Sequence, residues 1–216
     1  MTTKRLAIIG AGELGKLIAY HARGNKEFIV TGFYDDFSKL EEFENAPVLG
    51  KADQANADFE AGVFDYLMIG IGYNHMNARN NYLKRFKGVI PLANILHPSS
   101  YIDKSCKLGE GIFILPGVTL DTGVILHDNI LINAGATVAH HSEIGSNSFL
   151  APGVTVAGLV NIGECSFIGI GSIVLDCIQI AAHSTIGAGA VVTKNTEEYS
   201  VSIGIPAKTI KYNRPK

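Results

Sequence analysis

The sequence lacks the features that mark membrane and nucleic-acid-binding proteins. It contains no tryptophan and only seven prolines in 216 residues. The first apolar run, residues 6–9, is too short for a membrane span or a secretory signal, so we expect a cytosolic protein with no membrane partner. The 18 basic and 20 acidic side chains give a net charge of −2, and the densest basic cluster is residues 84–87. Such a balance gives no support to a nucleic-acid partner.

Cysteine is also scarce. Cys106, Cys165 and Cys177 are odd in number and have no CxxC spacing, which argues against a disulfide framework and against a cysteine-rich zinc site. We expect all three to be small, buried apolar side chains. What the chain does have is 47% hydrophobic residues and 24 glycines. This composition supplies the core of one large domain or two small ones, with many tight turns.

An aliphatic residue recurs at every sixth position through the second half of the chain. From Leu96 to Val192, all 17 positions at this spacing are Leu, Ile or Val. Six residues turn an α-helix by about 600°, which would scatter these side chains around its surface. The pattern predicts instead a parallel β-helix of three short strands per turn, in which residues 18 apart stack. Residues 96–194 make between five and six coils, and residues 195–199 with a polar tail would end the prism.

The first 95 residues predict a separate α/β unit. A strand at 5–9 leads into a G-x-G-x-x-G turn at 10–15 and a helix at 16–23, the context in which this motif binds phosphate groups. A second strand at 28–34 ends at the acidic pair Asp35 and Asp36, where a carboxylate can reach a ribose hydroxyl.

The same unit has room for only half of a dinucleotide-binding fold. A third strand at 66–71, a helix at 75–86 and a fourth strand at 89–95 fill the chain before the β-helix begins. We therefore expect a single nucleotide with a phosphate-linked group rather than NAD, and domains at 1–95 and 96–216. The alternative is that the glycines only allow a strand and a helix to pack closely and that they bind nothing.

The candidate catalytic residues are His140 and His141, which lie with Glu143 at a predicted corner of the β-helix. Gly158 stacks eighteen residues after His140, so an acyl carrier has room to approach the imidazole. A neutral imidazole can take a proton from an attacking amine or hydroxyl, and backbone N–H groups at a glycine-rich corner can hold an oxyanion.

A metal centre is the alternative at this corner, because γ-class carbonic anhydrases bind metal with histidines from neighbouring coils. His127 is 13 and 14 residues from the pair, which matches neither a shared corner nor the 18-residue stack. We therefore predict no metal.

The hexad period and the closing segment Gly204-Ile205-Pro206-Ala207-Lys208 resemble the left-handed β-helix of the hexapeptide-repeat acyltransferases. The whole chain, with its glycine motif and the segment 94–98, resembles the bacterial PglD/NeuD-type sugar acetyltransferases. This resemblance implies an N-terminal unit that holds a nucleotide-linked amino sugar. It also implies acetyl-CoA in a groove between the prisms of a homotrimer, and His140 as the base.

Further residue roles follow from the same resemblance. The nucleotide sugar would contact Gly12, Glu13, Leu14, Asp35, Asp36 and Gly72. The CoA groove would involve Phe149, Gly158, Ile170 and Ala188, of which Phe149 and Ala188 match by position and not by identity. One position departs from the family: a carboxylate follows the base there, whereas His141 follows it here. Glu143 is the residue that could substitute.

These inferences predict an N-acetyltransferase. It would act on the 4-amino group of a UDP- or dTDP-linked 4-amino-4,6-dideoxy sugar, for bacterial surface glycan or glycoprotein sugar synthesis, by direct attack of the amine on the thioester. O-acetylation of a sialic-acid-type sugar is the nearest alternative, although a hydroxyl acceptor needs the base more. A non-catalytic β-helix scaffold is the other, and it would tolerate loss of the glycine motif and the histidine corner.

Overall fold

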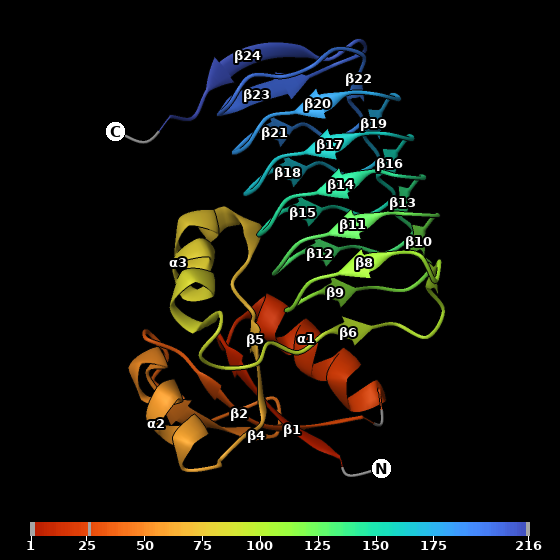
Figure 1. The fold of residues 1–216 in the computed structure, drawn as a ribbon. Coiled ribbons are helices and arrows are strands. Elements are labelled where there is room, and N and C mark those ends of the chain that lie inside the picture. Colours follow the sequence, from red (N-terminus) through yellow and green to blue (C-terminus); the bar gives the residue numbers. More distant parts are fainter. Residues whose placement is uncertain (1–2, 26, 215–216) are drawn as a thin grey trace. The chain divides into compact units, whose positions relative to one another are not determined.

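The computed structural model describes residues 3–25 and 27–214 and divides the chain into two compact units, 1–95 and 96–216 (Figure 1). The first unit has a five-stranded sheet in the order β3-β4-β2-β1-β5. Its strands are β1 (Lys4–Ile9), β2 (Phe28–Tyr34), β3 (Glu42–Phe43), β4 (Ala46–Gly50) and β5 (Tyr66–Ile69). Its helices are α1 (Glu13–Gly24), α2 (Ala55–Glu60) and α3 (Met76–Phe86), with 3-10 turns η1 (Ala52–Gln54) and η2 (Tyr73–His75).

Strand β1 is buried on both faces because helices cover both sides of the sheet. Successive side chains of a strand point to opposite faces. Ile9 belongs to the cluster that contains Ala55 of α2 and Phe86 of α3, whereas the Cγ2 methyl group of Ile8 lies beside Gly15 of α1. Strands β2 and β5 pair with β1 in parallel, so their carboxyl ends meet at one edge of the sheet. That edge is where ligands bind in open α/β sheets.

The predicted strands at 5–9, 28–34 and 66–71 and the two predicted helices are present, with small shifts of their ends. The predicted fourth strand at 89–95 is wrong as a single strand: Leu92 makes an isolated bridge with Leu67, and Ile95 already begins β6 (Ile95–Leu96). The sequence reading missed β3, β4 and α2. Strand β4 contains Pro47 and follows a turn in which Glu44 and Asn45 both have positive φ, so its residues carry the composition of a loop.

The second unit is a left-handed parallel β-helix. Its first and last two-residue strands are β6 (Ile95–Leu96) and β22 (Val191–Val192), and one strand follows another every six residues. Three sheets form the faces: β7-β10-β13-β16-β19-β22, β8-β11-β14-β17-β20, and a third that begins at β6 and continues through β9, β12, β15, β18 and β21. The strands between β6 and β22 are β7 (Tyr101–Ile102), β8 (Lys107–Leu108), β9 (Phe113–Ile114), β10 (Thr119–Leu120), β11 (Ile125–Leu126), β12 (Leu131–Ile132), β13 (Thr137–Val138), β14 (Glu143–Ile144), β15 (Phe149–Leu150), β16 (Thr155–Val156), β17 (Asn161–Ile162), β18 (Phe167–Ile168), β19 (Ile173–Val174), β20 (Gln179–Ile180) and β21 (Thr185–Ile186).

The 18-residue stack is present in every coil. Leu120 pairs with Val138, and Val138 in turn pairs with Val156. The repeated aliphatics are buried from Ile114 to Val192 and fill the prism. The corners use the left-handed backbone region, which favours glycine, and one column of corners is glycine at every level from Gly117 to Gly189.

The end of the prism differs from the predicted polar tail. Strand β23 (Ser200–Ile203) extends the third sheet in parallel with β21, and β24 (Lys208–Tyr212) returns antiparallel to it. The expectation of three buried cysteines is also wrong in part. Cys165 is buried and Cys106 is half-buried, but Cys177 is exposed, although Cys165 and Cys177 both occupy left-handed corners. No helix within residues 3–25 and 27–214 has the length and apolarity to cross a membrane.

Candidate functional site

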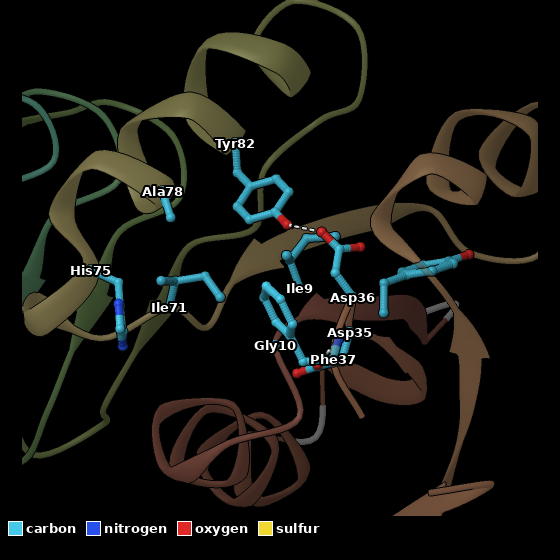
Figure 2. A pocket seen from close by; sticks show the side chains of 10 residues that line it. Ile9, Gly10, Asp35, Asp36, Phe37, Ile71, His75, Ala78 and Tyr82 are labelled. Atoms are coloured by element: carbon cyan, nitrogen blue, oxygen red, sulfur yellow. Dashed lines mark hydrogen bonds between the residues drawn. The ribbon is translucent and has the colours of Figure 1, made fainter. Parts of the chain in front are cut away.

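A pocket lies at the carboxyl edge of the first unit's sheet (Figure 2). Its cavity volume is about 420 Å³, and its wall is mainly apolar with carboxylates at one side. The lining residues follow β1, β2 and β5 or lie on η2 and α3: Ile9, Gly10, Tyr34, Asp35, Asp36, Phe37, Ile71, His75, Ala78 and Tyr82. A pocket of this size and lining is typical of a site for a small organic ligand.

Asp35 organises the two loops that border the pocket. One carboxylate oxygen accepts the N–H of Ala11 in the glycine loop at 2.8 Å. The other accepts the N–H groups of Phe37 and Ser38 at 2.9 and 2.8 Å. The half-buried carboxylate therefore holds the glycine loop to the loop after β2, and it places the ring of Phe37, which is 92% exposed, at the pocket.

Asp36 is held by a different set of partners. Its carboxylate accepts the hydroxyl of Tyr82 at 2.6 Å and the N–H of Ala52 at 3.0 Å (Figure 2). The hydrogen bond from Tyr82, followed by that from Ala52, lowers the pKa of Asp36 below its usual range. Burial and the hydrogen bond to Asp36 raise the pKa of Tyr82 to about 12. Asp36 is thus a carboxylate, and Tyr82 a neutral donor, at physiological pH.

The glycines of the loop divide into two kinds. A Cβ on Gly15 would lie 2.0 Å from the carbonyl oxygen of Gly10, and a Cβ on Gly70 would lie 2.9 Å from the Cα of Gly15. These three glycines let strand, loop and helix pack closely. A Cβ on Gly12 or on Gly72 would meet no atom within 4 Å. Close packing of strand and helix therefore explains Gly10, Gly15 and Gly70. It does not explain Gly12, which caps the start of α1 beside Glu13 and Leu14.

The sequence reading missed the wall that η2 and α3 contribute. His75, Ala78 and Tyr82 follow helical spacing, which places them on one face, and Figure 2 shows them along the same side of the pocket. Arg79, which is 2% exposed, donates to the carbonyl oxygens of Ile69 and Ile71 at 2.8 and 3.0 Å and holds the turn after β5. The signal was the i, i+3, i+7 spacing directly after a buried strand.

The second cluster of predicted site residues lies at a corner of the β-helix. His140 is exposed, and its ring lies against Gly158 of the next coil: a Cβ there would come within 2.6 Å of both Cε1 and Nε2. The predicted stack of His140 beside a residue without a side chain is therefore present. Leu159 donates its N–H to the carbonyl oxygen of His140 at 3.0 Å, which ties the two coils together at this point.

His141 contacts His140 and not a carboxylate. The two Nδ1 atoms are 3.3 Å apart, and the rings meet edge to face with centroids separated by 5.5 Å. The ring of His141 lies against Gly123 of the preceding coil. The two imidazoles thus extend along the prism in opposite directions from one corner.

Glu143 does not take the place of the carboxylate that is absent beside His140. Its Oε1 is 2.6 Å from Nε2 of His127, one coil earlier, and both side chains are about half exposed. In the described residues, no hydrogen bond or ion pair joins Glu143 to His140, so the expected support for His140 from Glu143 is not seen. In residues 3–25 and 27–214, no three His, Cys, Asp or Glu side chains come together as metal ligands.

The four residues expected at a CoA groove lie in different parts of the prism. Ile170 and Ala188 are exposed and stack in one column of corners, whereas Gly158 belongs to the column of His140. Phe149 is buried and packs against Phe167 at a centroid distance of 5.6 Å. Within one chain, these residues do not form a single groove.

Comparisons with known proteins agree for both units. Residues 5–86 match the family model of the PglD N-terminal domain, and residues 123–158 match the bacterial transferase hexapeptide model of six repeats. PerB from Caulobacter crescentus, solved with CoA and GDP-perosamine, is 29% identical with a TM-score of 0.88 over 97% of this chain and 99% of its own. The acetyltransferase domain of PglB from Neisseria gonorrhoeae is 24% identical, with a TM-score of 0.85 over 96% of this chain and 100% of its own, and shows the fold. No curated protein sequence matches the chain.

A mononucleotide-type α/β unit followed by a hexapeptide β-helix with an exposed corner histidine defines the class: the protein is an acyltransferase. More narrowly, the first unit matches the PglD N-terminal domain and the second unit matches the hexapeptide-repeat transferases, so the whole chain is similar to the PglD-type sugar acetyltransferases.

Proposed function

We propose that this protein transfers the acetyl group of acetyl-CoA to the amino group of a nucleotide-linked amino sugar. In finer terms, the acceptor is the 4-amino group of a 4-amino-4,6-dideoxy sugar carried by UDP or dTDP. The observation that carries the proposal is the His140 imidazole, exposed and lying against a glycine at a corner of the β-helix. The relative PerB, in complex with CoA and GDP-perosamine, supports this chemistry, and its structures include variants in which one histidine is replaced.

The reaction needs one base and no covalent enzyme intermediate. The amine nitrogen attacks the thioester carbonyl, a C–N bond forms, and the carbonyl electrons move to oxygen, where a backbone N–H can stabilise the oxyanion. His140 Nε2, which has no hydrogen-bond partner in the described residues, takes the proton of the attacking nitrogen. The C–S bond then breaks and CoA leaves as the thiolate.

The pocket of the first unit would hold the nucleotide. Gly12, Glu13 and Leu14 present the start of α1 to the diphosphate, because the first N–H groups of a helix have no partner within it. Asp36 retains lone pairs for a donor on the ribose or base, and Asp35 keeps both loops in place. Gly72 leaves open space beside η2.

The homotrimer is proposed from the resemblance to the family, and the positions of the candidate CoA residues support a groove between copies of the chain. Gly158 occupies one column of corners, and Ile170 and Ala188 occupy another. A groove that includes all three therefore requires the prisms of two copies of the chain. Sedimentation equilibrium of the purified protein should give three times the mass of the chain, and a monomer that retains full activity would contradict this assignment.

The deciding experiment is thiol release from acetyl-CoA with UDP-, dTDP- and GDP-linked 4-amino-4,6-dideoxy sugars and with a sialic acid. Saturable release with one amine, and a product that has gained one acetyl group on nitrogen, is the expected result. Release with the sialic acid alone would establish the O-acetyltransferase alternative. No release with any acceptor would support the scaffold. Inclusion of GDP tests the nucleotide, because PerB was solved with GDP-perosamine.

A further inference from the structure

We propose that His141 is a positioning residue, which accepts a hydrogen bond from Nδ1–H of His140 and so keeps Nε2 of His140 free to accept a proton. This inference rests on the proposed function. It assigns to a neutral imidazole the task that a carboxylate performs beside the histidine of a catalytic triad, where it sets the tautomer and orientation of the ring.

The contact between the two rings requires a single shared proton. Their Nδ1 atoms are 3.3 Å apart, and two neutral imidazoles can form a hydrogen bond there only if one donates and the other accepts. If His140 donates, its Nε2 carries a lone pair, and His141 is protonated on Nε2. If the direction is reversed, Nε2 of His140 carries the proton and the ring cannot act as a base at that atom. The proposed activity therefore selects the first arrangement.

The backbone and the ring of His141 are both held in place. Its φ is 57°, in the left-handed region, and its N–H donates to the carbonyl oxygen of Thr122 at 2.8 Å. Its ring lies against Gly123, where a Cβ would come within 3.0 Å of Cδ2. The next residue, Ser142, is fully buried and donates to the carbonyl oxygen of Ala157 at 2.9 Å. The backbone of His141 is thus anchored, and its exposed ring lies between Gly123 and the ring of His140.

The charged neighbours leave the pair without a carboxylate partner. In this column of corners, Asp121 lies in the preceding coil and Asp176 two coils beyond, and no hydrogen bond joins either to a histidine in the described residues. Glu143 is engaged with His127. When His140 takes the proton of the substrate, the two rings therefore share the positive charge. If Nδ1 of His141 already carried a proton, it could not accept the hydrogen bond from His140.

The first test removes the acceptor without straining the turn. His141 and Gly123 occupy the same corner in successive coils, with φ of 57° and 71°. Glycine adopts this backbone freely, so His141→Gly should not strain the turn. We expect kcat to fall by about tenfold, less than the ~10²–10⁴ that a positioned base contributes, because His140 remains and loses only its fixed tautomer and orientation. KM for both substrates should stay within about twofold. The matched control is Cys177→Gly, an exposed residue with φ of 60° two coils further on, which should leave kcat unchanged.

The second test replaces one acceptor by another. His141→Asp suits the left-handed region and supplies a charged acceptor. We expect it to restore kcat at high pH and to shift the acidic limb of the kcat profile upward by about one pH unit, because a nearby negative charge favours the protonated imidazole. A role in packing alone would leave His141→Asp as impaired as His141→Gly at every pH, because aspartate restores the acceptor but not the ring.

The third test does not depend on turnover. Imidazole ¹⁵N NMR of the wild-type protein above pH 8, with each ring assigned through its alanine variant, should show Nδ1–H at His140 and Nε2–H at His141. Finding Nε2–H at His140 would overturn the inference, as would unchanged kcat in His141→Gly while His140→Ala is impaired. If the wild type turns over no amine, the proposed function fails, and the tautomers still decide whether the hydrogen bond has the inferred direction.

Discussion

Gly158→Ala isolates the contact that the structure places at the base. The backbone at this position accepts a side chain, because its φ lies outside the left-handed region and the stacked positions carry Thr122, His140 and Asp176. The one obstacle is the His140 ring. The added Cβ would lie 2.6 Å from Cε1 and Nε2, which is about 0.8 Å short of the 3.4 Å at which ordinary contact begins.

The expected effect on stability is small. His140 is exposed, so its ring can move aside for about 0.5–1.5 kcal/mol, the usual energy of an off-rotamer side chain. A Gly→Ala change at a compatible backbone stabilises the protein by about 0.4–1 kcal/mol, because it lowers the conformational entropy of the unfolded chain. The net change is therefore within about 1 kcal/mol, and Tm should shift by no more than about 2–4 °C.

The expected effect on catalysis is large. A displacement of the base by about 1 Å can reduce the rate by about 10²-fold, and the whole contribution of a positioned base is about 10²–10⁴. We expect kcat to fall by about 10–100-fold in the thiol-release assay with the preferred amino sugar. In a His140→Ala background, the Gly158 substitution should reduce kcat no further, because its effect acts through the same ring.

Two results would refute this reasoning. Unchanged kcat in Gly158→Ala would show that the position of the imidazole does not limit the reaction. An equal loss in the two backgrounds, accompanied by a higher KM for acetyl-CoA, would show that Gly158 acts by admitting CoA rather than by contact with His140.

Other substitutions separate packing from ligand binding in the first unit. Gly12→Ala should keep Tm and raise KM for the nucleotide sugar, whereas Gly15→Ala should destabilise the unit by more than about 1 kcal/mol because its Cβ would meet backbone at 2.0 Å. Phe37→Ala, at a side chain that is 92% exposed, should leave the denaturant midpoint unchanged and raise the same KM; an unchanged KM would remove the ring from the site. Wild-type stability should fall as pH rises from about 10 to about 12, since the unfolded chain releases the Tyr82 proton first, and Tyr82→Phe should make that fall shallower although Tyr34 still contributes.

The hexad repeat made the β-helix predictable down to its register. One aliphatic in every six residues admits a single inward side chain per strand, so stacking at 18 residues follows, and it placed Gly158 against His140. The pair of Glu143 and His127 was not predictable in this way. Their separation of 16 residues is not a stacking interval, and the contact depends on how two long side chains lean between adjacent coils.

In the N-terminal unit, too, some features could be predicted from the sequence and others could not. The glycine motif and the acidic pair were visible because short-range motifs specify a turn. The spacing of His75, Ala78 and Tyr82 places them on one face of a helix, but that this face borders the pocket depends on how α3 packs against the sheet. Their places in the motif do distinguish Gly12 from Gly15, because its second glycine leaves space for a phosphate group and its third lets the helix pack against the strand.

The central claim is acetyl transfer to a nucleotide-linked amino sugar with His140 as the base. The most direct test compares wild-type protein with His140→Ala for acetyl-CoA-dependent formation of N-acetylated product from UDP-, dTDP- and GDP-linked 4-amino sugars, measured by mass spectrometry. The account predicts saturable product with one of these acceptors and a kcat at least about tenfold lower in the variant, with an unchanged Tm. No acetylated product from any amine, or equal kcat in the two proteins, would contradict it.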